Sequence, residues 1–388
     1  MTDRTRTRIV CTLGPASADE GMIRTLAVSG MDVVRLNFSH GTYEWHAERI
    51  ASVRKVAAEL KVHTAILQDL CGPKIRVGPM ADGVELKAGD DFVLTADEVV
   101  GDAHRAQVTY PLLAAEVRPG DPVLLDDGLL ELKVEHVRGT DVVTRVVEGG
   151  PLSSRKGVNF PQTQLSVPAV TEKDERDLRF GLAQGVDYVA ASFVRQASDL
   201  DRIRRIMTEV GVTRPVVVKI EKREAVENLE SIVQAADAVM VARGDLGIEV
   251  PIEEVPVIQK RCICLCLKHR RPVITATQML DSMIRNPRPT RAEATDIANA
   301  IFDGTDAVML SGETASGAYP VQAVRVMDRI AQRAERAMEG LHWDQQEPVV
   351  PVEHEVAAVA RAACSLSETL NARAILACTT TGRTVQAI

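Results

Sequence analysis

The chain has 388 residues, which exceeds one ordinary hydrophobic core and predicts two or three domains. Its formal net charge of −8 and its dispersed basic residues disfavour nucleic acid or an acidic membrane surface as a partner, so a small-molecule ligand is expected. The seven cysteines lack regular spacing, no apolar run reaches the roughly 18 residues of a membrane span, and the amino-terminal residues are charged. These features predict a reduced, soluble, cytoplasmic protein.

Eight short runs rich in β-branched residues recur along the chain, and a helical pattern follows each of them. A parallel (β/α)₈ barrel explains this alternation better than an open doubly wound sheet, which usually has fewer strands and stays the alternative. The predicted strands are 8–14, 33–39, 64–70, 188–193, 216–222, 238–243, 272–278 and 307–312. Four capping boxes mark helix starts: Ser17 with Glu20, Thr171 with Asp174, Ser198 with Asp201, and Thr290 with Glu293.

The third and fourth predicted strands are much farther apart in the chain than one βα unit. Short strands with DG, GD and GT turns fill the gap, which predicts a small β-barrel domain inserted after strand 3. Past a polar link, a helix (354–370) and a strand (373–379) begin a C-terminal α/β domain. Because one βα unit cannot bury both of its faces, we expect a shortened chain or an end that needs a partner. The predicted domains are 1–73 and 165–345 (the two parts of the barrel), 74–164 (the inserted β lid) and 346–388 (the incomplete C-terminal domain).

Polar side chains gather where the predicted strands end. In a parallel barrel the loops at the carboxyl ends of the strands converge on one mouth, so these residues mark a site. Lys219 and Glu221 share one face of the fifth strand, where an unpaired charge would be costly. Purely structural ion pairs are the competing interpretation, which so many convergent polar strand ends disfavour. The other residues of this set are Arg35, Asn37, Ser39, Asp69, Arg243, Asp245, Thr277, Ser311 and Glu313.

The chemistry of these residues suits a metal and an anionic substrate. Glu221 and Asp245 follow adjacent strands and form a pair of oxygen ligands for Mg²⁺, which commonly takes only one or two carboxylates. Lys219, Arg35 and Arg243 supply the positive charge that a phosphate or an enolate needs. The turn that begins at Gly244 presents backbone amides that are expected to hold an anion.

Several long segments resemble the signature segments of pyruvate kinases, in that family's order, across roughly residues 7–330. They are RIVCTLGPAS, VVRLNFSHG, VVVKIEKREAVENL, VMVARGDLGIE, TATQMLDSM, PTRAEATDIANA and AVMLSGETASG. The resemblance implies the same barrel, inserted lid and C-terminal α/β domain. It also implies transfer of the phosphoryl group of phosphoenolpyruvate to ADP, giving pyruvate and ATP in glycolysis, in a protein that is a homo-oligomer, mostly a tetramer in the family.

The resemblance assigns a role to each matching residue. Lys219 matches the lysine that stabilises the transferring phosphoryl group, and Arg35 matches the phosphate-binding arginine. Thr277 matches the threonine that stands beside the methylene carbon that gains a proton. Glu221 and Asp245 match the Mg²⁺ ligands, with Mn²⁺ as an alternative metal. The substrate-binding matches are Lys219, Gly244, Asp245 and Thr277, and the nucleotide-side matches are Asn37, His40, Arg76 and Lys156.

One departure from the common family pattern concerns K⁺. Many members bind this ion through an Asn, a Ser, an Asp and a Thr, of which Asn37, Ser39 and Asp69 remain here. The fourth position is Leu70, and Lys74 stands where those members have Glu. An ammonium on a four-carbon stem can supply a fixed positive charge near the ion's place. The sequence therefore resembles the K⁺-independent branch, and we predict that K⁺ is not required.

Two other functions compete with this interpretation. One is another Mg²⁺-dependent barrel that acts on an enolate, such as a lyase of 2-oxo acids; the inserted lid and its cations Arg76 and Lys156 disfavour it. The other is a catalytically weak or non-catalytic metabolite-binding fragment of the family. The chain keeps Lys219, Glu221 and Asp245, whose buried charges are costly, and this disfavours a non-catalytic role.

Overall fold

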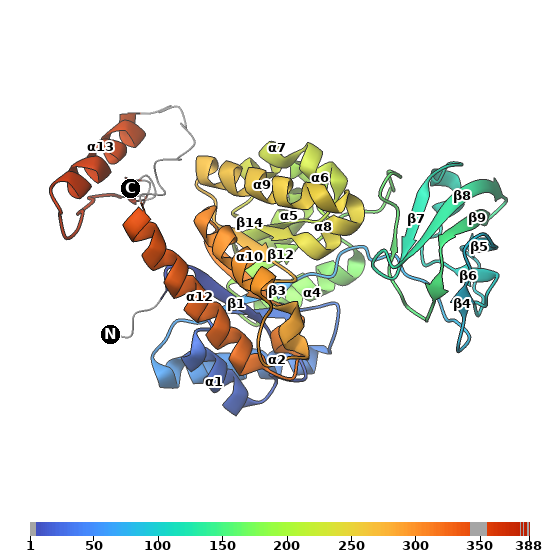
Figure 1. The fold of residues 1–388 in the computed structure, drawn as a ribbon, viewed down its shortest axis with the longest axis horizontal. Coiled ribbons are helices and arrows are strands. Elements are labelled where there is room, and N and C mark those ends of the chain that lie inside the picture. The colour runs from blue at the N-terminus through green and yellow to red at the C-terminus, as the bar shows by residue number, and fades with distance from the viewer. Residues whose placement is uncertain (1–4, 342–354, 381, 383, 386–387) are drawn as a thin grey trace.

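The computed structural model describes residues 5–341, 355–380, 382, 384–385 and 388. It contains a closed barrel of eight parallel strands, ringed by helices, with a β-rich domain attached at one side (Figure 1). The predicted (β/α)₈ barrel is confirmed, and the open sheet is excluded. The order around the barrel is β1-β16-β15-β14-β13-β12-β3-β2. These strands are β1 (Arg8–Thr12), β2 (Val33–Asn37), β3 (Ala65–Asp69), β12 (Tyr188–Ala191), β13 (Val216–Ile220), β14 (Ala238–Ala242), β15 (Val273–Ala276) and β16 (Ala307–Leu310).

Two apolar layers hold the barrel together. Side chains such as Val10, Leu67 and Met240 fill its interior, and a larger cluster lies between the strands and the surrounding helices. Each strand is buried on both faces, which is why the sequence shows nearly continuous apolar runs rather than alternation. The strands end earlier than predicted, although polar residues such as Asp69 and Lys219 still lie within them. Ser39 and Glu221 therefore lie in βα loops at the barrel mouth.

Local capping explains where several helices begin. The boxes of Thr171 with Asp174 and Thr290 with Glu293 are confirmed. The box of Ser17 with Glu20 is wrong, because Asp19 caps α1 instead. The box of Ser198 with Asp201 is also wrong, because Ser198 lies inside the short 3₁₀ turn that precedes α5. The main barrel helices are α1 (Glu20–Ser29), α2 (Tyr43–Leu60), α4 (Glu172–Ala183), α5 (Leu200–Val210), α6 (Arg223–Glu227), α7 (Leu229–Ala235), α8 (Arg243–Glu249), α9 (Val255–His269), α10 (Arg291–Phe302), α11 (Gly312–Ala315) and α12 (Pro320–Leu341).

A small β domain is inserted between β3 and β12, as predicted. It consists of a curled six-stranded sheet, in the order β11-β7-β8-β9-β5-β6, and a two-stranded ribbon of β4 and β10. Phe92 and Phe160 lie in its own apolar core, which is separate from the core of the barrel. The elements are β4 (Glu85–Leu86), β5 (Asp91–Thr95), β6 (Arg105–Gln107), α3 (Leu113–Glu116), β7 (Pro122–Leu125), β8 (Leu130–Arg138), β9 (Asp141–Glu148), β10 (Gly150–Pro151) and β11 (Val158–Asn159).

The carboxyl-terminal segment agrees only partly with the prediction. The predicted helix is present as α13 (Glu355–Thr369), and Figure 1 shows it standing away from the barrel. The strand predicted at 373–379 is wrong, since these residues form no regular structure and Leu376 is 95% exposed. A strand needs an edge to pair with, and the described residues nearby offer none. The predicted polar link falls mostly on 342–354, outside the described residues. Of the described helices, none is long and apolar enough to cross a membrane.

Candidate functional site

A buried cation lies at the centre of the barrel mouth. Lys219, near the end of β13, places its Nζ 2.5 Å from Glu221 Oε1 and 3.4 Å from Asp69 Oδ1. The same ammonium donates a hydrogen bond of 2.8 Å to Ser192 Oγ. Ser192 follows β12 and was not singled out from the sequence, because a lone serine after a strand carries no signal. The three strand ends together form a compact polar network.

Asp69 links this ammonium to a second cation. Arg35, on β2, directs Nη2 and Nε to Asp69 Oδ2 at 2.6 and 2.7 Å, and its Nη1 donates to Thr12 Oγ1 at 3.0 Å. Asp69 therefore has a cation beside each carboxylate oxygen. Strands β2, β3 and β13, from one side of the barrel, thus bring together the Arg35, Asp69 and Lys219 positions that the sequence predicted.

The network perturbs the protonation of its members. Burial raises the pKa of Asp69, but Lys219 and Arg35 outweigh it and the net pKa is lowered. Burial lowers the pKa of Lys219, yet Asp69, Glu221 and Asp245 raise it above the ordinary value. Glu221 differs, because burial and repulsion from Asp245 raise its pKa despite the nearby ammonium. The carboxylates of Glu221 and Asp245 would therefore be stabilised by a further positive charge.

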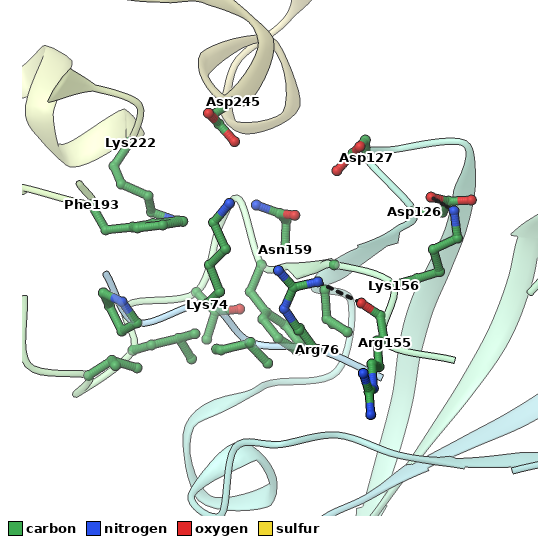
Figure 2. Close-up of a pocket in the computed structure, with 18 of the residues that line it drawn as sticks. Lys74, Arg76, Asp126, Asp127, Arg155, Lys156, Asn159, Phe193, Lys222 and Asp245 are labelled. Carbon is green, nitrogen blue, oxygen red and sulfur yellow. Dashed lines mark hydrogen bonds and ion pairs between the residues drawn. The ribbon is translucent and has the colours of Figure 1, made fainter. Parts of the chain in front are cut away.

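Glu221 and Asp245 fit a divalent cation. Glu221 is held in place because its Oε2 accepts a hydrogen bond of 2.8 Å from the Phe193 amide. Asp245, in the first turn of α8, points into a cavity (Figure 2), and its carboxylate has no hydrogen bond or ion pair within the described residues. The part of the chain that the structure describes holds no cluster of three or more His, Cys, Asp or Glu residues arranged for a metal. Two carboxylates, completed by substrate and water, are what Mg²⁺ commonly takes.

The cavity that Asp245 faces lies between the barrel mouth and the inserted domain (Figure 2). Its volume is about 300 Å³. The inserted domain contributes Arg76 and Lys156, whose ammonium pairs with Asp126 at 2.8 Å, while the loop after β2 contributes His40. Three of the four predicted nucleotide-side residues thus line one cavity with Asp245.

A second cavity, of about 530 Å³, opens at the ends of β1, β2 and β16. Arg35, Asn37 and Trp45 line it, together with Ser316. His40 lines both cavities and so marks where they meet. Of the predicted nucleotide-side residues, Arg76 and Lys156 therefore line the first cavity, Asn37 lines the second, and His40 lines both.

Two sequence interpretations at α8 need correction. Arg243 was expected to supply charge to an anion, but its Nη1 pairs with Asp296 at 2.7 Å and its Nη2 donates to the Thr277 carbonyl at 2.7 Å. The Gly244 amide was expected to hold an anion, but it donates to Thr277 Oγ1 at 2.8 Å. Arg243 and Gly244 instead hold Thr277, whose φ of 69° is unusual for a β-branched residue. Such an imposed conformation is typical of a functional position.

The remaining K⁺-related residues occupy distinct places. Asn37 Oδ1 accepts a hydrogen bond of 3.0 Å from the Ser39 amide. The Leu70 side chain lies in the apolar core, while its carbonyl accepts from Ser192 Oγ at 2.8 Å. Lys74 is exposed and lines the cavity that holds Asp245 and His40. Burial lowers the pKa of His40, and the charge of Lys74 lowers it further.

Comparison with known proteins identifies the family. The profile described as "Pyruvate kinase, barrel domain" matches residues 4–324. The chain belongs to the pyruvate kinase family. A pyruvate kinase of Corynebacterium glutamicum is 50% identical over 387 residues, which is 99% of this chain and 80% of that protein. Pyruvate kinase 2 of Synechocystis is 48% identical over 98% of this chain and 65% of its own length, and a Geobacillus stearothermophilus pyruvate kinase is 52% identical over 86% and 58%. The predicted enzyme class, a pyruvate kinase and hence a phosphotransferase, is confirmed.

Proposed function

We propose that this chain transfers the phosphoryl group of phosphoenolpyruvate to ADP and that the resulting enolate is protonated to pyruvate. The observation that supports this most strongly is the buried network of Lys219, Asp69 and Glu221 beside the unpaired carboxylate of Asp245. Family membership supplies the reaction, and the network supplies the charges that the reaction needs. A lyase of 2-oxo acids binds no nucleotide, so it would not explain the inserted-domain cations Arg76 and Lys156.

Phosphoryl transfer passes through a loose transition state in which charge spreads over the equatorial oxygens. Such a reaction needs positioning and positive charge more than covalent help. In our proposal Lys219 stabilises the transferring group, and Arg35 binds phosphate. Both are preorganised, since Asp69 holds the Arg35 guanidinium at 2.6 Å and lies 3.4 Å from the Lys219 ammonium.

Glu221 and Asp245 would hold the divalent metal, Mg²⁺ or Mn²⁺. Bound there, it would withdraw charge from the enolate oxygen and so ease departure from phosphorus. The Phe193 amide orients the Glu221 carboxylate, and α8 carries Asp245. We also assign Gly244 and Asp245 to substrate binding, as the family resemblance implies.

We assign the final proton transfer to the side of Thr277. The Thr277 hydroxyl accepts from the Gly244 amide at 2.8 Å and donates to the Ala276 carbonyl at 2.6 Å, while Arg243 Nη2 donates to the Thr277 carbonyl. A hydroxyl held in this way can orient water toward the methylene carbon of the enolate. On the opposite side, Arg76 and Lys156 reach the nucleotide from the inserted domain, which acts as a lid.

The first test is direct. Purified chain supplied with phosphoenolpyruvate, Mg²⁺ and ADP is expected to form pyruvate, measured by coupling to NADH oxidation with lactate dehydrogenase. Omitting ADP or Mg²⁺ should abolish the signal. Pyruvate formation without ADP would favour a different barrel enzyme. A well-folded protein that forms none would leave a metabolite-binding role.

We further propose that the reaction does not require K⁺. Arg35 and Lys219 already neutralise Asp69, and Lys74 adds a positive charge to the cavity that contains Asp245. In a buffer of matched ionic strength, replacing K⁺ with tetramethylammonium is expected to change kcat less than twofold. Loss of turnover on removal of K⁺ would contradict this proposal.

The companion variant is Lys74→Glu. It is expected to lower K⁺-free kcat/KM by about 10²-fold, since the cavity exchanges a positive for a negative charge. Lys74 is exposed, so the melting temperature should stay within about 2 °C of wild type. Lys87→Glu, on an exposed residue of the inserted domain that lines none of the cavities described above, is the matched charge reversal and should leave kcat/KM unchanged.

A further inference from the structure

A polar contact joins the inserted domain to the barrel beside the site. Asn159, on β11 of the inserted domain, donates a hydrogen bond of 3.1 Å from Nδ2 to Glu249 Oε1. Lys222, in the loop after β13, donates to the same oxygen at 2.7 Å. Glu249 is the last residue of α8 and is only 4% exposed. One carboxylate oxygen of Glu249 thus accepts hydrogen bonds from both the inserted domain and the barrel.

The two barrel partners follow the proposed metal ligands in the chain. Lys222 is the residue directly after Glu221. Glu249 lies four residues after Asp245 on α8, so the two side chains project from the same side of this one short helix. A displacement of Asn159 therefore affects, through Glu249 and Lys222, both segments that carry the proposed metal ligands: α8 and the loop after β13.

A second part of the inserted domain lies near α8. Gly128, in the turn between β7 and β8, lies so close to Ile248 that an added Cβ would be 4.0 Å from Ile248 Cγ2. Another connection lies beside one of the chain segments that link the domains, where Arg195 donates to the carbonyls of Leu165 and Val167 at 2.7 Å each. The Asn159 contact adjoins the linking segment 160–167, whereas Gly128 lies in a separate turn of the inserted domain.

The remaining oxygen of Glu249 is unusual. Glu249 Oε2 is buried and has no hydrogen-bond partner among the described residues. A buried carboxylate oxygen without a donor is costly, so this side chain is not explained by stability alone. Its two donors both face the site cavity, which Asn159 and Lys222 line (Figure 2).

We propose that Glu249 is a positioning residue that latches the inserted domain over the site and couples its closure to the geometry of Glu221 and Asp245. This inference rests on the proposed function, because it gives the lid and the metal carboxylates their roles. With the latch formed, Arg76 and Lys156 face Asp245 across the cavity. With the latch broken, the inserted domain loses its hydrogen bond to α8 and no longer holds these cations over the nucleotide.

Asn159→Ala is the sharpest test. It removes the donor from the inserted domain and leaves Lys222 paired with Glu249, so no buried charge loses its partner. We expect kcat/KM for ADP to fall about tenfold, which corresponds to about 1.4 kcal/mol, with a severalfold rise in half-saturating Mg²⁺. The melting temperature should change by less than about 2 °C. Asn159→Asp, which sets a second carboxylate against Glu249, should lose more activity than Asn159→Ala although it is isosteric.

Ser154→Ala is the matched control. Ser154 accepts a hydrogen bond of 2.9 Å from the Met80 amide within the inserted domain and does not reach the barrel. This variant should keep wild-type kcat/KM and Mg²⁺ dependence. Wild-type kinetics in both Asn159 variants would overturn the latch, as would an equal loss in Ser154→Ala.

An activity-independent readout separates this proposal from the proposed function. Amide hydrogen exchange at the linking segments, 72–76 and 160–167, should rise in both Asn159 variants and not in Ser154→Ala. If the wild-type chain forms no pyruvate, the proposed function fails and the exchange result alone decides the latch. Unchanged exchange in the Asn159 variants overturns it.

Discussion

Lys219→Met is expected to lower kcat by about 10³-fold and to destabilise the fold by about 3–5 kcal/mol. Among the described residues, the Lys219 ammonium is the only cation paired with Glu221, at 2.5 Å from Oε1, and it is also the second cation beside Asp69. Removing it leaves the buried Glu221 carboxylate without a compensating charge, and the transferring phosphoryl group loses its preorganised cation. Steady-state kinetics and chemical denaturation would measure the two effects.

Added Mg²⁺ should recover part of the lost stability of this variant but not its kcat. A divalent cation between Glu221 and Asp245 neutralises the buried carboxylate, and binding to the native state alone stabilises that state. It cannot replace the lysine at the phosphoryl group. Near-wild-type kcat in Lys219→Met would contradict the assigned role.

Lys173→Met is the matched control for this variant. Lys173 pairs at 2.5 Å with Asp177, a buried carboxylate on the outer helix α4. Its removal should therefore reduce stability in the same direction, without the large loss of kcat and without rescue by Mg²⁺.

The barrel was predictable from the sequence because its signal is repeated. Eight apolar runs at βα spacing allow few other folds, and an error at one strand end does not change the answer. The strand predicted at 373–379 failed for the opposite reason. Its apolar residues match the local preference, but a strand forms only where another edge accepts its hydrogen bonds. That information is not local.

The site was predictable in its residue types and less so in its contacts. Lys219, Glu221 and Asp245 stand out because a charge at the end of an apolar strand needs an explanation. The direction of the Arg243 side chain could not be read, since its partner Asp296 lies on α10, far along the chain. Glu249 also gave no signal, because its donors come from another domain and from another loop. The partners of such side chains depend on which distant segments the fold brings together.

Asp245→Asn is expected to lower kcat/KM by about 10²–10³-fold while leaving the stability of the metal-free protein close to that of wild type. Asp245 has no hydrogen bond or ion pair within the described residues, so the fold loses no contact. Its charge repels Glu221, whose pKa it helps to raise, but it also attracts the Lys219 ammonium, so the two effects of removing that charge on stability oppose each other. The activity falls because one of two metal carboxylates is gone.

Thermal unfolding with and without Mg²⁺ distinguishes this explanation from a general loss of structure. Wild type should be stabilised by Mg²⁺, and Asp245→Asn much less so, because the ion retains only one carboxylate. Glu221→Gln is the informative comparison. It also removes a metal ligand, but it deprives Lys219 of its closest anion and should lower the stability of the metal-free protein. Equal stability losses in the two variants would show that Asp245 is structural, and an undiminished Mg²⁺ effect in Asp245→Asn would place the metal elsewhere.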